Sequence, residues 1–195
     1  SLMRDQIILH QRISQLSGGY MRPIVAYNPW TDINEDDASL HLALDAVRNR
    51  GFKAVKIYPP MGYFPRGNAN NSSYPTDAKH PNLAMLDAKL NAMFEECRAL
   101  DIPVMAHSNE SMGRRPSHNI LGGPSGWKTF FAHPSNKSAK INLGHLGGET
   151  GGGDTSNWSA DFVDLMGQGN QLYGDLGFWD GLVDGDIQAA ERIKN

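Results

Sequence analysis

Two histidines stand at points where a short apolar run of the chain stops and polar or glycine residues follow. His107 closes the run at residues 102–106 and precedes Ser-Asn-Glu, and His145 closes a similar run at residues 140–144. Imidazole nitrogens are common protein ligands of zinc and related divalent metals. We therefore treat both histidines as candidate metal ligands. The alternative is that both are satisfied core residues.

The position of these histidines carries more information than their type. Apolar runs of this length between helical patterns predict buried parallel strands. In barrels and doubly wound sheets, the carboxyl ends of the strands line the active site, while the strand interiors pack. Tyr58 ends the strand pattern at residues 52–58, and Asn109 follows His107 closely. We expect both side chains to lie near the histidines and to bind substrate.

Strand and helix patterns alternate along the whole chain. Strands are expected at residues 22–27, 52–58, 102–107, 140–145 and 171–176. Helices are expected at residues 4–16, 83–100, around 126–132 and at 186–194. A further helix is expected to be capped by Asn34 and to end at Gly51, and another to begin with Ser159 as its cap. Such alternation predicts a parallel sheet with right-handed crossovers. The strand spacing suits a (β/α)8 barrel, of which the chain can hold about five units.

A complete five-stranded doubly wound protein is the alternative fold, with its ligand where the strand order reverses. Sequential strand order would indicate a barrel segment instead.

Two long loops follow expected strands. The loop at residues 61–82 is either a lid over the site or a disordered excursion. The loop after residue 110 carries Arg114 and Arg115, which either hold a substrate carboxylate or are solvated surface residues.

Composition limits the class of protein. The chain has 195 residues and a net charge of −3, with lysines and arginines scattered along it. No basic stripe suggests nucleic acid, and no apolar run is long enough to span a membrane. The single cysteine, Cys97, falls on the apolar face of a predicted helix and is expected to be a core thiol. We expect one domain over residues 1–195 and a cytoplasmic location.

Four motifs together resemble the amidohydrolase superfamily, and most nearly its amidohydrolase-2 branch of metal-dependent TIM-barrel hydrolases and decarboxylases. They are Gly-Phe-Lys-Ala-Val-Lys-Ile-Tyr-Pro at residues 51–59, Ile-Pro-Val-Met-Ala-His at 102–107, Asn-Leu-Gly-His-Leu-Gly-Gly at 142–148 and Leu-Tyr-Gly-Asp at 172–175. The resemblance runs from about residue 22 to residue 175, with the motifs in the family's order. It implies a partial (β/α)8 TIM barrel, an incomplete central segment covering barrel strands 3 to 7.

The resemblance also implies roles for single residues. His107 corresponds to a metal ligand, and His145 to a second ligand or an acid/base. Lys56 lies in the strand where some relatives carry a carboxylated lysine, but it precedes the strand tip and is interpreted as structural. Asp175 matches the family's seventh-strand aspartate, which does not bind metal. The implied cofactor is a divalent metal, with zinc as the first expectation.

The implied activity is hydrolysis of a C–N or C–O bond in a small-molecule substrate by metal-activated water. The alternatives are non-hydrolytic decarboxylation and a non-catalytic barrel fragment or binding module. The family's first-strand His-x-His and eighth-strand Gly-Ser-Asp patterns are absent from the chain, so full activity is expected to need further segments. Open sheet edges predict a homo-oligomer.

Overall fold

The computed structural model describes residues 2–34, 38–75, 82–111, 115–148 and 158–177, together with Trp179. The five strands of its sheet are β1 (Val25–Ala26), β2 (Val55–Ile57), β3 (Val104–His107), β4 (Ile141–Gly144) and β5 (Leu172–Gly174). The α-helices are α1 (Leu2–Leu16), α2 (Pro29–Asn34), α3 (Ala38–Asn49), α4 (Leu83–Ala99), α5 (Pro124–Ala132) and α6 (Trp158–Gly167). Short 3-10 helices are η1 (Pro59–Met61), η2 (Asn68–Asn70), η3 (Pro116–Gly122) and η4 (Pro134–Asn136).

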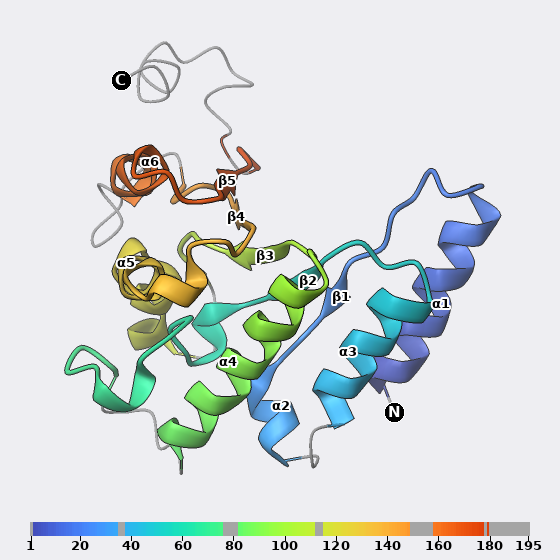
Figure 1. The fold of residues 1–195 in the computed structure, drawn as a ribbon, viewed down its shortest axis with the longest axis horizontal. Helices are drawn as coiled ribbons and strands as arrows, with labels where there is room; N and C mark the ends of the chain where they lie inside the picture. Colours follow the sequence, from blue (N-terminus) through green and yellow to red (C-terminus); the bar gives the residue numbers. More distant parts are fainter. Residues whose placement is uncertain are drawn as a thin grey trace.

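All five strands are parallel and lie in the sheet in chain order, β1-β2-β3-β4-β5. The prediction of a parallel sheet alternating with helices is confirmed. The doubly wound alternative is wrong for these strands, because it requires the strand order to reverse. Helices α3, α4, α5 and α6 succeed one another along one side of the sheet (Figure 1).

The two faces of the sheet differ in polarity because alternate residues of a strand point to opposite faces. One face is apolar and buried, and its members include Val55, Ile57, Val104, Ala106, Ile141 and Leu143. The opposite face carries a row of half-buried or exposed residues in register across four strands: Lys56, Met105, Asn142 and Tyr173. The helices pack on the first face, and the second is the face from which the candidate site residues project.

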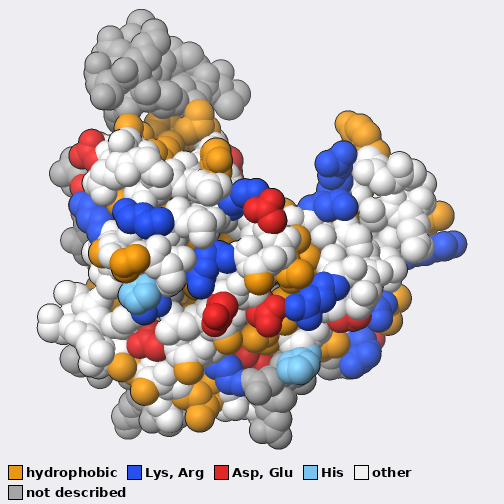
Figure 2. Space-filling model, in the orientation of Figure 1, with side chains coloured by type: hydrophobic (Ala, Val, Ile, Leu, Met, Phe, Trp, Pro, Cys, Tyr) orange, Lys and Arg blue, Asp and Glu red, His pale blue; other side chains and the backbone are white. Residues whose placement is uncertain are grey.

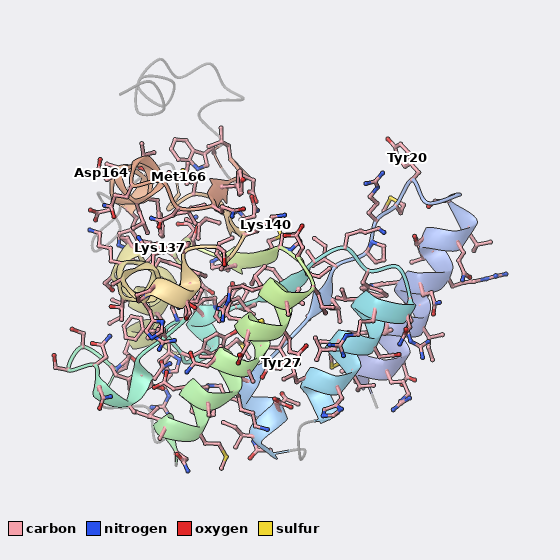
Figure 3. All side chains as sticks on the ribbon, viewed as in Figure 1. Tyr20, Tyr27, Lys137, Lys140, Asp164 and Met166 are labelled. Atoms are coloured by element: carbon pink, nitrogen blue, oxygen red, sulfur yellow. The ribbon has the colours of Figure 1, made fainter. Side chains whose placement is uncertain are left out.

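Helix α2 was not expected from the sequence. Asn34 was expected to cap the next helix, but it is the last residue of α2. Instead the buried carboxylate of Asp32 accepts a hydrogen bond from the backbone N–H of Leu40, at 3.2 Å, near the start of α3. It also accepts the hydroxyl of Tyr27 at 2.8 Å, beside α4 (Figure 3). Asp32 thus ties β1, α2 and α3 together.

Helix α4 agrees with its predicted span. Asn82 caps it by accepting the N–H of Met85 at 2.9 Å. Its buried face includes Leu90 and Cys97, and burial raises the pKa of the Cys97 thiol to about 12. This burial confirms the prediction of a core cysteine. A thiol held protonated in an apolar core is a poor nucleophile. His41 is exposed on α3.

The loop after β2 is anchored over its described part, residues 61–75. The Asp87 carboxylate on α4 accepts hydrogen bonds from the backbone N–H groups of Gly67, Asn68 and Ala69, at 2.9–3.0 Å, and from the Asn68 amide at 2.8 Å. The hydroxyl of Tyr74 donates to the carbonyl of Gly62 at 2.8 Å. This part of the loop is therefore a packed wall beside α4. Residues 76–81 of the same predicted loop lie outside the described residues.

The ends of the fold differ from expectation at Ser159. Ser159 lies inside α6 and is not its cap, because α6 begins one residue earlier, at Trp158. Helix α1 buries only Ile7, and the apolar side that includes Leu9 and Ile13 is exposed. Exposed Tyr20 stands at the tip of the segment between α1 and β1 (Figure 3). The helix expected at residues 186–194 lies outside the described residues.

The described surface has no single charged region on the face drawn in Figure 2, where lysine and arginine side chains are dispersed among acidic and apolar ones. In the part of the chain that the structure describes, no helix is both long and apolar enough to cross a membrane. Among the described residues, strands β1 and β5 each have one neighbouring strand in the sheet.

Candidate functional site

The structure brings the two strand-end histidines together. His107 is the last residue of β3, and His145 comes directly after β4, the adjacent parallel strand. Their ring centroids lie 4.9 Å apart in an edge-to-face arrangement. Because the carboxyl ends of parallel strands meet at one edge of a sheet, two separate apolar runs deliver two imidazoles to the same place.

His107 is buried, with 7% of its surface exposed, and it stacks on Tyr58 with ring centroids 4.4 Å apart. Burial lowers its pKa to about 4, because the charged ring is desolvated. Backbone oxygens of Glu110 and Asn109 oppose this shift, while His145 and Lys56 add to it. The ring nitrogen Nε2 lies 3.3 Å from the carbonyl oxygen of Glu110. Because a carbonyl oxygen only accepts, Nε2 carries the proton in the neutral ring, which leaves the lone pair on Nδ1.

His145 is held at the start of a left-handed turn. Its φ is +73°, that of Leu146 is +39°, and Gly147 and Gly148 both have φ of +81°. Non-glycine residues rarely adopt this conformation, and its strain concentrates at functional sites. The turn is fixed by the N–H of Gly147, which donates to the carbonyl of Ser108 at 2.8 Å. This strained exit directs the His145 ring toward the end of β3.

Hydrogen bonds also fix the ring of His145. Its Nδ1 lies 3.0 Å from the carbonyl oxygen of Gly177, so Nδ1 carries a proton that it donates to that carbonyl. The carbonyl of His145 accepts the indole N–H of Trp179 at 2.8 Å. An imidazole whose second nitrogen donates to a carbonyl is oriented as metal-binding histidines commonly are.

Both glycines of the turn are required by their surroundings as well as by their positive φ. A Cβ at Gly147 would lie 2.6 Å from the backbone nitrogen of Ser159 and 2.8 Å from the carbonyl carbon of Trp158. A Cβ at Gly148 would clash with the side chain of Asn109. Asn109 therefore packs against the turn, and its Oδ1 accepts the N–H of Glu110 at 2.7 Å.

Asp175, directly after β5, positions His145. Its Oδ1 accepts the backbone N–H groups of His145, at 3.0 Å, and of Gly177, at 3.1 Å, and its Oδ2 accepts the Asn142 amide at 3.1 Å. Burial raises the pKa of Asp175, but these donors outweigh it, so the pKa is lowered overall and the carboxylate is ionised near neutral pH. The sequence drew attention to Asp175 only through the family resemblance and gave no sign of this support.

Lys56 reaches the same site from β2. Its Nζ lies 3.4 Å from the point where a Cβ on Gly144 would stand, and Oδ2 of Asp175 lies 3.8 Å from that point. Burial lowers the pKa of Lys56, and the charge of Asp175 offsets part of that shift. Lys56 had been interpreted as structural because it precedes the strand tip. The lysine side chain is long enough to cross β3, so its ammonium group ends among the site residues.

The remaining predicted site residues are placed unequally. Tyr58 covers His107, and its hydroxyl shares a hydrogen bond of 2.7 Å with the Ser111 hydroxyl. Arg115 is exposed just before η3, and Arg114 lies outside the described residues. The structure thus assembles Tyr58, His107 and His145, while the predicted role of the arginine pair stays a prediction.

The histidines supply part of a metal centre. Within the described ranges of the chain, no group of three or more His, Cys, Asp or Glu side chains is arranged to hold a metal ion. Metal centres take roughly three or four protein ligands. The imidazoles of His107 and His145 could supply two of those positions. Comparison of the chain with protein-family models, curated proteins and solved structures finds no match.

Proposed function

We propose that the chain carries half of the metal centre of a hydrolase of the amidohydrolase type, with His107 and His145 as ligands of one divalent metal, first of all zinc. The observation that carries this proposal is the 4.9 Å approach of the two rings at the carboxyl ends of adjacent parallel strands. The remaining ligands come from outside the described residues. The sequential sheet with helices along one side fits a segment of a (β/α)8 barrel.

The electrostatics of the pair suit metal binding. A metal ligand must present a lone pair, so a histidine that resists protonation keeps its ligand form to lower pH. Burial does this for His107, whose pKa falls to about 4. His107 Nε2 donates to the carbonyl of Glu110 and His145 Nδ1 donates to the carbonyl of Gly177, so the two hydrogen bonds orient both rings.

A divalent metal at such a site lowers the pKa of a bound water and polarises the carbonyl of a substrate, which is the chemistry of C–N or C–O bond hydrolysis. The chain's own residues orient the reaction. Asp175 holds the backbone of His145 in place, and Tyr58 stacks on one face of the His107 ring. The anchored loop at residues 61–75 follows the same end of β2 and forms a wall there.

The test is the metal content of the purified chain after loading with zinc and desalting, measured by plasma mass spectrometry. We expect bound zinc in the wild type and its loss in His107→Ala and in His145→Ala. His133→Ala is the matched control, because His133 is exposed and bonds only locally to Ser135. Zinc at background in the wild type would contradict the proposal. So would zinc contents in His107→Ala and His145→Ala that equal the content of His133→Ala.

A further inference from the structure

Helix α1 is apolar on two opposite sides. Its inner side includes the buried Ile7, and the helix lies beside α3 at one end of the molecule (Figure 1). On the outer side, Leu2, Leu9 and Leu16 recur at every seventh residue, and Ile13 follows Leu9 by four residues. Side chains at these spacings share one face of a helix. All four are exposed, and we call them the α1 stripe.

The exposed apolar surface extends beyond the α1 stripe. A groove of about 290 Å³ lies between α1 and the chain that enters β1, and its apolar lining includes Ile13, Met21 and Ile24. Met21 and Ile24 are exposed like the stripe. Extended apolar patches on a protein surface mark contacts with other molecules. A molecule that covers the α1 stripe therefore also covers apolar surface next to the helix.

Two opposite charges flank the α1 stripe on the same side. Asp5 precedes Leu9 by four residues and Arg12 follows it by three, so both project from one flank of the stripe. Both are exposed, and within the described residues neither side chain makes an ion pair or a hydrogen bond. They lie about 10 Å apart along the helix, too far to pair with each other. They suit a facing surface with the same charges in reverse order.

A second copy of α1 that runs antiparallel has that reverse order. When the two helices pair about Leu9, each Leu9 meets the other, and Leu2 meets Leu16 of the second copy. The two-fold axis keeps the charged flanks on the same side of the contact, so Asp5 lies opposite Arg12 of the second copy, twice over. In a parallel pair the charged flanks fall on opposite sides, and the charges stay unpaired. The stripe and its charges are therefore self-complementary in the antiparallel arrangement.

We propose that the α1 stripe is a homodimer interface through which two copies of this chain pair helix to helix, antiparallel. The contact uses the outer face of α1 and not the open edge of β1. Because the same surface is used on both copies, the two-fold axis closes the assembly at two. None of the residues of the histidine site takes part, so the interface is tested without reference to the metal.

Sedimentation velocity of the purified chain from about 1 to 200 µM covers the range expected of a small interface. We expect the weight-average mass to rise toward twice the monomer mass. Leu9→Gln removes the central contact and should raise the dimer Kd by about tenfold or more. Ile8→Gln is the matched control, because Ile8 is 52% exposed and Leu9 56%, but Ile8 lies outside the stripe. Its Kd should equal that of the wild type, and circular dichroism checks that each variant folds.

Charge reversal tests the pairing of the flanks. Asp5→Arg or Arg12→Asp alone places like charges opposite each other in the dimer and should raise the Kd by about fivefold or more. The double variant Asp5→Arg/Arg12→Asp restores opposite charges and should recover wild-type affinity. Residues seven positions apart do not pair within one helix, so this recovery reports a contact between two copies.

Disulfide formation tests the direction of the helices. Under oxidation, Leu9→Cys should give a covalent dimer, because the two substituted residues meet at the two-fold axis. Leu16→Cys should not, because the two copies of residue 16 are roughly 20 Å apart in an antiparallel pair. The native Cys97 is buried in the core and does not compete.

Cross-linking at Leu9→Cys alone, together with recovery of affinity in the charge-reversed double variant, would support the antiparallel dimer. A chain that stays monomeric at every concentration would overturn it. So would association that Leu9→Gln leaves unchanged, which would indicate pairing elsewhere, such as at the open edge of β1. Equal cross-linking of Leu9→Cys and Leu16→Cys would indicate a parallel pair, and a double variant as weak as the single ones would refute the proposed charge pairing.

Discussion

Substitution of Gly147 by alanine tests the reasoning that the strained turn after β4 positions His145. Gly169 provides a matched control, because its φ of +77° is close to the +81° of Gly147. An alanine at either position pays the cost of left-handed backbone, about 1–2 kcal/mol. The two positions differ in the space available for an added Cβ. Nothing lies within 4 Å of a Cβ at Gly169, whereas a Cβ at Gly147 would meet backbone atoms of Ser159 and Trp158 at 2.6–2.8 Å.

The contacts at Gly147 set the size of the expected difference. Backbone atoms cannot rotate away as a flexible side chain can, so the turn or the start of α6 must shift. Overpacking of this kind costs roughly 1–3 kcal/mol. Gly147→Ala should therefore lower the free energy of unfolding by about 1–3 kcal/mol more than Gly169→Ala does.

Urea unfolding followed by circular dichroism measures both variants. The difference should appear as a midpoint lower by roughly 1 M urea in Gly147→Ala, given an m value of about 2 kcal/mol per molar. Zinc content, measured in native conditions, should fall in Gly147→Ala and remain in Gly169→Ala, because only the first displaces His145. Equal unfolding free energies for the two variants would refute the steric argument, and full zinc content in Gly147→Ala would refute the link between turn and ligand.

Three further outcomes are expected. As the pH falls from 6.5 to 4, the metal-free chain should lose about 3 kcal/mol of its free energy of unfolding through His107. The pKa of His107 is about 4 in the folded state and about 6.5 in the unfolded state, so the unfolded state takes up the proton first. Urea unfolding of His107→Gln across that pH range should lack this loss. Asp32→Ala removes a buried carboxylate 3.8 Å from the Lys89 ammonium and should cost about 3–5 kcal/mol, whereas Asp161→Ala, in an exposed ion pair, should change the unfolding midpoint little. Cys97, whose thiol pKa is raised by burial to about 12, should react with iodoacetamide only in denaturant; modification of the native chain, read by mass spectrometry, would contradict its core position.

The strand-end histidines were predictable because their signal is local. An apolar run that stops at a polar residue marks the end of a buried strand, and adjacent parallel strands end together. That logic led to His107 and His145 without knowledge of the strand order. The alternation of strand and helix patterns similarly predicted the parallel sheet.

The supporting residues were not predictable in this way, because their contacts join distant parts of the chain. Asp175 acts on His145 across 30 residues, and only because the turn exposes the His145 N–H. Lys56 reaches the site because Gly144, two strands away, has no side chain. A more local signal existed for helix α2, since Pro29 at its first position is typical of a helix start.

The carboxylate of Asp87 has a consequence for how this protein can be altered. It anchors the loop after β2 through the backbone N–H groups of residues 67–69, which every amino acid except proline provides. The exposed side chains of Ser72 and Ser73 belong to the same loop and take no part in that anchoring. Randomising those outward positions while Asp87 is kept should change what the loop presents to a ligand without unfolding it, so this loop is the natural first library for redirecting specificity.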